Sequence, residues 1–330
     1  MAKSDGPVAV FGAGVLLKHL NALTQEVDGV RSGADIEPLH RMRVASRRLR
    51  AVLPLFARPV APKQARRWKK EVRRITRALG PARDADVQIE QLQAYLAALP
   101  PGPQRPGIRR LILRQTQQRE KLQPNVDAAL DRFLASGIVE KMTEACSGVL
   151  SPDLTDAASP RLYHLAHRAV REKLSRFQAY EQYVDQPERV DELHAMRIAA
   201  KRLRYTLETF APQYDGSLKP YLSAVKEAQE LLGQIHDCDV WSQQLPAFME
   251  TERSRSLRYF GHERPFKRLL PGLLAFQADL ADQRTQTYAR FCQRWAEWRS
   301  AGLWEDLLET VQRPVWPERP EPQEPGEVLA

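Results

Sequence analysis

One helical motif occurs twice in this chain, and the repeat limits the folds that the chain can adopt. The segment Leu39–Arg50 reads LHRMRVASRRLR, and Leu193–Arg204 reads LHAMRIAAKRLR, at an offset of 154 residues (193 − 39). A second motif follows each copy. Gly80–Val87 reads GPARDADV and Gly233–Val240 reads GQIHDCDV, at an offset of 153 residues (233 − 80). Two separate motifs at nearly the same offset indicate a duplicated unit.

Each copy of the first motif places its cations in one row along a helix. With about 100° between residues, the basic positions of a copy fall within a sector of about 80°. The adjacent sector is mostly apolar, so each helix combines a packing face with a cationic flank. No acidic residue occurs between Arg41 and Ala57, which favours contact with an outside anion or with acids elsewhere in the fold. The rows consist of His40, Arg43, Arg47 and Arg50 and of His194, Arg197, Lys201 and Arg204.

A second group of cations lies on helices that we expect beside the repeated motif. The segment Gln64–Leu79 carries a basic stripe with helical spacing. In the second half, Lys219 and Lys226 occupy matching positions, but Glu230 replaces the equivalent of Arg77. The second half is therefore less basic here than the first. The stripe of the first half consists of Arg66, Lys70, Arg73 and Arg77.

The chain is expected to be all-α, because no segment shows sustained period-two alternation. The repeat divides it into a first helical half (1–146), a linker (147–160) and a second helical half (161–312). The remaining residues, 313–330, are rich in proline and glutamate and are expected to be disordered. Four large aromatic residues at helical spacing are expected in the core: Tyr205, Trp241, Trp295 and Trp298.

Prolines and glycines predict several helix ends. The helix that carries the first motif should kink or weaken near Pro54 and end before Pro59. Ile108–Phe133 should form one long helix or a pair of helices, with Pro124 as the joint of a pair. The glycine that opens each second motif should end a helix, and the first aspartate of that motif should cap the next one. These glycine and aspartate pairs are Gly80 with Asp84 and Gly233 with Asp237.

Composition predicts a basic cytoplasmic protein. The formal charge is +9 and the pI is about 9.6. The three cysteines stand far apart, without metal-ligand spacing, which indicates a reducing compartment. The segment Met1–Gly6 lacks the apolar core of a signal peptide. No stretch approaches about 20 uninterrupted apolar residues, so we expect neither a membrane span nor a membrane partner.

These motifs resemble the CHAD domain, the conserved-histidine α-helical domain. The resemblance rests on the doubled His-x-x-Arg-(Val/Ile)-x-x-(Lys/Arg)-Arg-Leu-Arg helix and on the Leu-Gly-x-x-x-Asp-x-Asp-Val turn in each half, and it covers roughly Val8 to Val311. It implies two four-helix-type bundles that arose by duplication and are related by a pseudo-twofold axis, with basic residues lining the groove between them. Members of the family bind long-chain inorganic polyphosphate, and some are fused to a triphosphatase domain.

The resemblance implies that this chain binds polyphosphate without catalysing a reaction, as a scaffold or as a module that targets polyphosphate granules. Polyphosphate is a flexible chain of negative charges, so its site needs cations along a line. Arginine suits this role because its planar guanidinium can bond two phosphate oxygens at once. The rows of the two signature helices would supply opposite walls, widened by the second group of cations. Protonation of His40 and His194 near neutral pH would tighten binding as the pH falls. No cofactor is expected.

A nucleic-acid-binding protein is one alternative, because basic charge alone does not distinguish between polyanions. Proteins that bind single strands interleave stacking aromatic residues with their cations. Leu39–Arg50 contains no aromatic residue, and the second copy is followed only by Tyr205. We therefore expect polyphosphate rather than nucleic acid as the ligand.

Another alternative is an enzyme of polyphosphate or triphosphate metabolism, or an accessory subunit of one. The aspartates of the second motif suggest a metal site, but we interpret them as helix caps or as partners of arginines. The chain has no nucleophile constellation, no P-loop and no Glu-x-Glu-x-Lys motif of the triphosphatase domain. A catalytic companion would thus be on another chain. The aspartates are Asp84, Asp86, Asp237 and Asp239.

Overall fold

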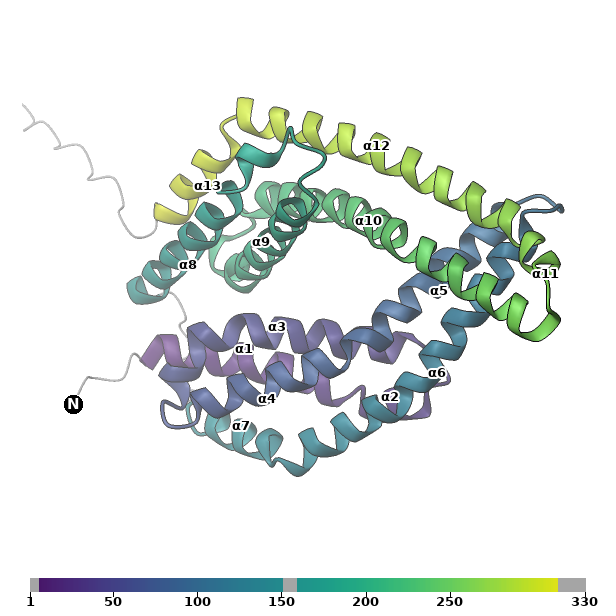
Figure 1. The fold of residues 1–330 in the computed structure, drawn as a ribbon. Coiled ribbons are helices and arrows are strands. Elements are labelled where there is room, and N and C mark those ends of the chain that lie inside the picture. The colour runs from purple at the N-terminus through teal and green to yellow at the C-terminus, as the bar shows by residue number, and fades with distance from the viewer. Residues whose placement is uncertain (1–5, 151–158, 314–330) are drawn as a thin grey trace, which may run out of the picture.

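The computed structural model describes residues 6–150 and 159–313, and every regular element in these ranges is a helix (Figure 1). The predicted all-α class is confirmed. Most of the predicted linker and tail lies outside the described residues. In chain order the helices are α1 (Gly6–Thr24), α2 (Val27–Ser32), α3 (Glu37–Val60), α4 (Ala65–Ala78), α5 (Gly80–Ala98), α6 (Arg105–Ala135), α7 (Ile138–Ser147), α8 (Pro160–Gln178), η2 (Glu181–Tyr183), α9 (Val190–Phe210), η3 (Ala211–Tyr214), α10 (Lys219–Phe260), α11 (Arg264–Lys267), α12 (Leu270–Ser300) and α13 (Leu303–Gln312).

The helices form two groups with matching internal contacts (Figure 1). In the first group, α3 packs against α1 and α4, and α7 packs against α1. In the second group, α9 packs against α8 and α10, and α13 packs against α8. The pairs α5 with α6 and α10 with α12 extend from the two groups and meet at one end of the molecule (Figure 1). The signature motif thus lies on α3 in one group and on α9 in the other.

A continuous hydrophobic core runs through both groups. The apolar face of α3 that the sequence predicted is buried, with Leu39, Met42 and Leu49 at most 2% exposed. The stretch Gly6–Ser32 is long and apolar enough to cross a membrane, but Leu16, Leu20 and Leu23 of α1 within it are fully buried in this core. The four aromatic residues expected in the core are also buried: Tyr205, Trp241, Trp295 and Trp298.

Contacts between aromatic rings and an ion pair join the two signature helices. The rings of Phe56 on α3 and Phe210 on α9 lie 6.1 Å apart, and Phe11 of α1 stacks on Phe210. Beside them, Arg48 Nη2 of α3 lies 2.9 Å from Glu208 Oε2 of α9. Direct packing of α3 on α9 therefore fixes how the two cationic rows face each other.

A second hydrophobic cluster closes the far end of the molecule, where α5 and α6 meet α10, α11 and α12. Its largest members are Trp241 and Phe276, whose rings lie 5.6 Å apart in an edge-to-face arrangement. The two groups of helices are thus joined at both ends, by the main core and by this smaller cluster.

The prediction that the first signature helix ends before Pro59 was wrong. α3 continues through Pro54 and Pro59 to Val60, and α6 continues through Pro124 as one helix. A proline removes one backbone hydrogen bond but leaves the side chains around it free to pack. Phe56 and Ala57 of α3 are fully buried, and their tertiary packing outweighs the missing bonds.

As predicted, α4 ends at Ala78, just before Gly80. The predicted helix end at Gly233 was wrong, as were the predicted helix starts after Asp84 and Asp237. Gly80 opens α5, and Gly233 lies inside the continuous helix α10.

Neither Gly80 nor Gly233 has a positive φ. Each instead lies beneath an arginine of a signature helix. A Cβ at Gly80 would lie 3.2 Å from Arg43 Nη1, and one at Gly233 would lie 3.5 Å from Arg197 Nε. The repeated glycine makes room for the repeated arginine.

Two further glycines allow α6 and α12 to touch through their backbones. A Cβ on Gly107 of α6 would overlap the carbonyl oxygen of Leu269, and one on Gly272 of α12 would overlap that of Gln104. Rotation of a side chain cannot relieve such contacts, because the partner atoms belong to the backbone. The smaller hydrophobic cluster depends on this close approach.

We expect Gly272→Ala to lower the free energy of unfolding by about 3 kcal/mol, because the added methyl group forces α6 and α12 apart. Urea denaturation monitored by circular dichroism measures the change. Gly14→Ala is the matched control, since a Cβ there meets open space on α1. It should stabilise the helix by up to about 1 kcal/mol. A Gly272→Ala protein as stable as the wild type would show that the two backbones do not touch.

Candidate functional site

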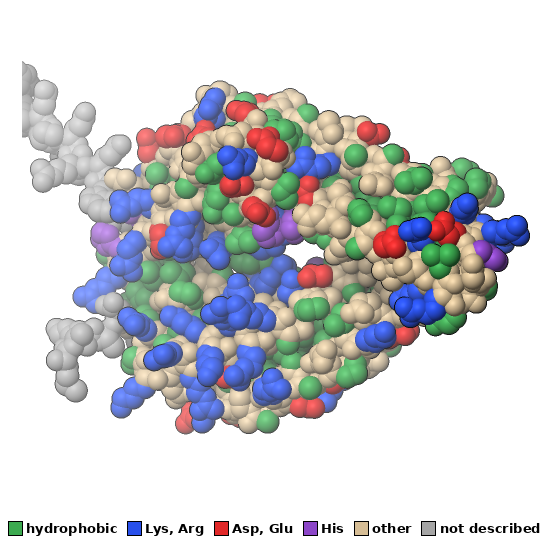
Figure 2. Space-filling model, viewed as in Figure 1, with side chains coloured by type: hydrophobic (Ala, Val, Ile, Leu, Met, Phe, Trp, Pro, Cys, Tyr) green, Lys and Arg blue, Asp and Glu red, His purple; other side chains and the backbone are tan. Residues whose placement is uncertain are grey.

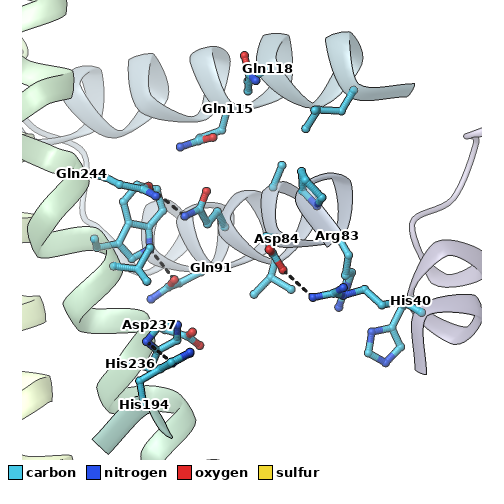
Figure 3. Close-up of a pocket in the computed structure, with 18 of the residues that line it drawn as sticks. His40, Arg83, Asp84, Gln91, Gln115, Gln118, His194, His236, Asp237 and Gln244 are labelled. Carbon is cyan, nitrogen blue, oxygen red and sulfur yellow. Dashed lines mark hydrogen bonds and ion pairs between the residues drawn. The ribbon is translucent and has the colours of Figure 1, made fainter. Parts of the chain in front are cut away.

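A pocket of about 750 Å³ lies between the two signature helices and the helices that follow them (Figure 3). We call it the central pocket. Figure 2 shows Lys and Arg side chains gathered above and below the hollow at the middle of this face. The pocket is lined by His40, Arg43 and Arg47 of α3, by Pro81, Arg83, Asp84, Ala85, Val87, Gln88 and Gln91 of α5, by Gln115, Gln118 and Leu122 of α6, by His194, Arg197 and Lys201 of α9, and by His236, Asp237, Val240, Trp241 and Gln244 of α10.

The α3 wall presents three side chains about one turn apart. Arg43 donates from Nη1 to the carbonyl oxygen of Thr76 and from Nη2 to Asp84 Oδ1, each at 3.3 Å. His40 lies beside Arg83 (Figure 3), whose guanidinium pairs with Glu90 at 3.2 Å. Arg43 is therefore held at the wall by weak bonds, and its guanidinium remains at the pocket surface.

Each signature helix has two arginines with a buried Nε that donates no hydrogen bond to the described residues, Arg47 and Arg48 on α3 and Arg197 and Arg204 on α9. One arginine of each pair, Arg47 or Arg197, lines the central pocket. A buried donor without a partner costs roughly 1–3 kcal/mol. An anion bound in the central pocket would supply the acceptors that Arg47 and Arg197 lack.

Positive charge is concentrated in the central pocket. Five Arg and Lys side chains line it, against two aspartates. Burial first, and then the charges of Arg197, Arg47 and Arg43, together lower the pKa of Lys201 to about 7. Burial also lowers the pKa of Arg43 and of Arg197. These shifts mean that the empty site is electrostatically strained and that an anion would relieve the strain.

Two histidines pair across the α9 and α10 wall (Figure 3). His194 Nδ1 lies 3.0 Å from His236 Nδ1, so one ring donates to the other. Burial first, and then the charges of His194 and Arg197, lower the pKa of His236 to about 4. Burial also lowers the pKa of His194 and of His40. These histidines are therefore mainly neutral at pH 7, and Lys201 is the group expected to titrate there.

The end of the pocket away from the cations is lined by amides. Gln88 Nε2 of α5 donates to Gln244 Oε1 of α10 at 3.1 Å. Trp241 Nε1 donates to Gln91 Oε1 at 2.8 Å, and its ring is 1% exposed. Gln115 of α6 lies across from these residues (Figure 3). This wall offers uncharged hydrogen-bonding groups and no exposed aromatic face.

Six of the predicted binding residues line the central pocket, and eight do not. Arg50, Arg73 and Arg77 are exposed. Partial burial lowers the pKa of Arg50 most, followed by the charges of Arg202, Arg73 and Arg77, so Arg73 and Arg77 lie near Arg50. Arg204 pairs with Glu208 at 3.0 Å. Lys226 pairs with Glu230 at 3.7 Å. The remaining three are exposed on α4 or at the start of α10: Arg66, Lys70 and Lys219.

Sequence reasoning missed several residues of the pocket that the repeat itself could have revealed. Arg83 and His236 occupy equivalent positions of the second motif, and both line the central pocket. The two residues differ in type, so a search for repeated residue types does not find them. Gln91 and Gln244 are likewise related by the offset of 153 (244 − 91) and both line the pocket. Equivalent positions of the two halves therefore line the pocket even where, as for Arg83 and His236, the residue types differ.

The aspartates of the second motif are partners of arginines rather than helix caps. Asp84 and Asp237 lie inside α5 and α10 and cap neither helix. Asp86 Oδ1 accepts from Arg119 Nε at 2.7 Å, and Asp239 accepts from Arg284 in the same way at 2.5 Å. These two buried pairs tie α5 to α6 and α10 to α12. Within the described residues, no three His, Cys, Asp or Glu side chains converge as metal ligands would.

A comparison with models of protein families places this fold and site in a known class. Residues 14–246 match the model of the CHAD domain, and the chain belongs to that family. The crystal structure of the CHAD domain from the plant Ricinus communis superposes with a TM-score of 0.55 at 25% sequence identity. That likeness covers 86% of this chain and 92% of the plant domain.

Curated relatives are longer than this chain. Two uncharacterized proteins of Mycobacterium tuberculosis, from strains CDC 1551 / Oshkosh and H37Rv, are each 30% identical over 178 residues. The match covers 52% of this chain and 33% of each relative, so it spans about a third of their length. The names of these relatives state no activity.

Proposed function

We propose that this protein binds long-chain inorganic polyphosphate in the central pocket as a non-catalytic module. The observation that carries the proposal is that two residues of the pocket lining, Arg47 on α3 and Arg197 on α9, each have a buried Nε donor without an acceptor among the described residues. Phosphate oxygens suit such donors, because a guanidinium and a phosphate form strong charge-assisted bonds. A ligand that bridges both helices would satisfy both donors at once.

The shape of the charge distribution supports a linear polyanion. Beyond the pocket, the row on α3 continues to Arg50, which lies near Arg73 and Arg77 of α4. The cations thus form a path along α3 rather than a single compact site. A long phosphate chain would contact both the pocket and this path. We propose that Arg50, Arg73 and Arg77 bind the chain where it leaves the pocket.

The proposal includes an internal duplication with a basic groove between the two halves, 1–146 and 161–312. The matching helix contacts of the two groups support it. The repeated placement of Arg43 over Gly80 and of Arg197 over Gly233 supports it further. In this view, each half contributes one wall of the groove.

Nucleic acid fits the central pocket less well than polyphosphate. Among the described residues of the lining, Trp241 is the one Trp, Tyr or Phe; it is almost fully buried and donates its indole N–H to Gln91. The pocket therefore offers no exposed large aromatic ring as a stacking platform. As an accessory subunit of a polyphosphate-metabolising enzyme, the protein would use the same site. We propose cytoplasmic polyphosphate granules as its location.

A competition titration tests this function. Labelled long-chain polyphosphate is bound to the wild type, and unlabelled polyphosphate, duplex DNA or single-stranded RNA is added at constant salt, since salt alone shifts affinity for every polyanion. We expect only polyphosphate to displace the label at low concentration. A variant with Arg43, Arg47, Arg197 and Lys201 changed to alanine should not bind. Equal displacement by all three polyanions would contradict the proposal and indicate a generic basic surface.

A further inference from the structure

Large apolar side chains are exposed at the end of the molecule where α10 and α12 meet. Tyr259 and Phe260, the last residues of α10, are 77% and 61% exposed. Leu257 in the turn before them and Leu274 near the start of α12 are 41% and 52% exposed. We call residues 250–274 the tip. Figure 1 shows it, with α11, at the end opposite α8 and α13.

The tip is strongly basic. Residues 250–268 contain six Arg and Lys against three Glu, and residues 105–114 of the adjacent α6 add four Arg and no acid. The glutamates are already neutralised, because Glu252 pairs with Arg110, Arg114 and Arg255 and the other two pair with Arg253. Four exposed cations have no ion pair among the described residues: Arg258, Arg264, Lys267 and Arg268.

The tip is firmly built, so its exposed rings are held in place by the fold. Gly261 ends α10 with a φ of +71°. Ser256 Oγ donates to the carbonyl oxygen of His262 at 3.1 Å, and Arg253 Nε donates to Glu263 at 2.7 Å. Phe266 of α11 is buried in the smaller hydrophobic cluster. These hydrogen bonds and the buried Phe266 hold the turn in place, while Tyr259 and Phe260 remain exposed to solvent.

The combination of exposed rings, exposed leucines and unpaired cations matches the surface of a bilayer that contains anionic lipids. Tyr and Phe favour the membrane interface, and cations near it are attracted by anionic headgroups. Single-stranded nucleic acid would use the two rings and the cations, but it would leave Leu257 and Leu274 exposed, whereas a bilayer would bury them. A second copy of this chain would bring two strongly basic tips together. We propose that the tip binds the surface of an anionic lipid bilayer.

This proposal concerns a part of the chain beyond residue 246, where the match to the family model ends. It differs from our expectation of no membrane partner, which was based on the lack of long apolar runs. A surface formed by a helix end and its neighbours requires no such run. The tip and the central pocket are separate surfaces, so the pocket would stay open to its ligand on a membrane.

Co-flotation with vesicles tests the proposal. The full chain is mixed with vesicles of phosphatidylcholine alone or of phosphatidylcholine with phosphatidylglycerol. We expect flotation only with phosphatidylglycerol. Arg258→Gln with Arg264→Gln and Lys267→Gln should weaken partitioning by about a hundredfold, because each cation near an anionic surface contributes about fivefold. Tyr259→Ser with Phe260→Ser should weaken it at least about tenfold through lost apolar burial.

Two controls separate the tip from basic charge elsewhere. Arg58→Gln with Lys63→Gln and Arg132→Gln removes three exposed cations outside the tip and should leave more of the binding intact than the tip variant. Arg47→Gln with Arg197→Gln, which alters the central pocket, should float like the wild type. The proposal is overturned if the tip variants and the first control lose binding equally. It is also overturned if the tip binds single-stranded RNA but not vesicles. A wild-type protein that is a dimer in solution and becomes a monomer in the Tyr259→Ser and Phe260→Ser variant would overturn it as well.

Discussion

Replacing Arg47 and Arg197 with glutamine is expected to lower the affinity for long-chain polyphosphate by about a hundredfold or more. Each arginine offers a buried Nε donor with no acceptor among the described residues. A hydrogen bond to a charged group contributes roughly 1.5–3 kcal/mol, so the loss of two such bonds exceeds the loss of two distant charges. Isothermal titration calorimetry with size-fractionated polyphosphate measures the change.

The control for this prediction removes the same amount of charge from two exposed sites outside the central pocket, both in the first half of the molecule. Arg58→Gln with Arg132→Gln should reduce the affinity by less than about tenfold, because exposed ion pairs are weak. The Arg47 and Arg197 variant should unfold at no lower urea concentration than the wild type, because the substitution removes like charges that repel one another. Equal loss of affinity in both variants would place the ligand outside the central pocket.

The affinity for polyphosphate is expected to rise as the pH falls through about 7. Lys201 has a pKa of about 7 because it is buried near Arg197, Arg47 and Arg43. Its neutral form binds an anion weakly, whereas a bound anion stabilises the charged form and raises the pKa. Binding therefore takes up a proton, and lower pH favours the complex. Titrations in two buffers with different ionisation enthalpies measure this uptake directly.

Lys201→Arg is the variant that tests this assignment, because an arginine stays charged across the whole pH range. Its affinity should depend much less on pH than that of the wild type. The other titratable groups near Lys201 are His194 on the same helix and His236 and Asp237 on α10. A pH profile that is unchanged in Lys201→Arg and lost in His194→Gln would assign the proton to the histidine pair instead.

The helical class and the core faces could be predicted because they depend on periodicity within single segments. Leu39, Met42 and Leu49 recur at helical spacing, and all three are buried. The same reasoning selected the aromatic residues of the core. A helix face is a local property of the sequence, so no knowledge of distant contacts was needed.

Rules for helix ends failed where tertiary contacts decided the outcome. Pro54 and Pro59 lie in a helix whose neighbouring side chains are buried in the core. Gly233 lies within the continuous helix α10, where Arg197 crosses above it. A local rule takes account of the missing N–H of proline or the missing Cβ of glycine. It takes no account of a side chain from another helix that packs beside that residue.

Only part of the candidate site could be predicted, because charge pattern does not reveal which side of a cation faces a cavity. Arg204 shares the row of Arg197 and Lys201, yet it pairs with Glu208. Lys219 and Lys226 match positions of the first half, but they do not line the pocket. The amide wall carries no charge, so a search for cations passed over it.

The measurement that tests the central claim most directly is a crystal structure of the protein with long-chain polyphosphate. The account predicts phosphates in the central pocket, with oxygens within hydrogen-bond distance of both Arg47 Nε and Arg197 Nε and further phosphates near Arg50 and Arg73. Phosphates bound only on outer surfaces, around Lys219 and Lys226 or at the tip, with the central pocket empty, would contradict it.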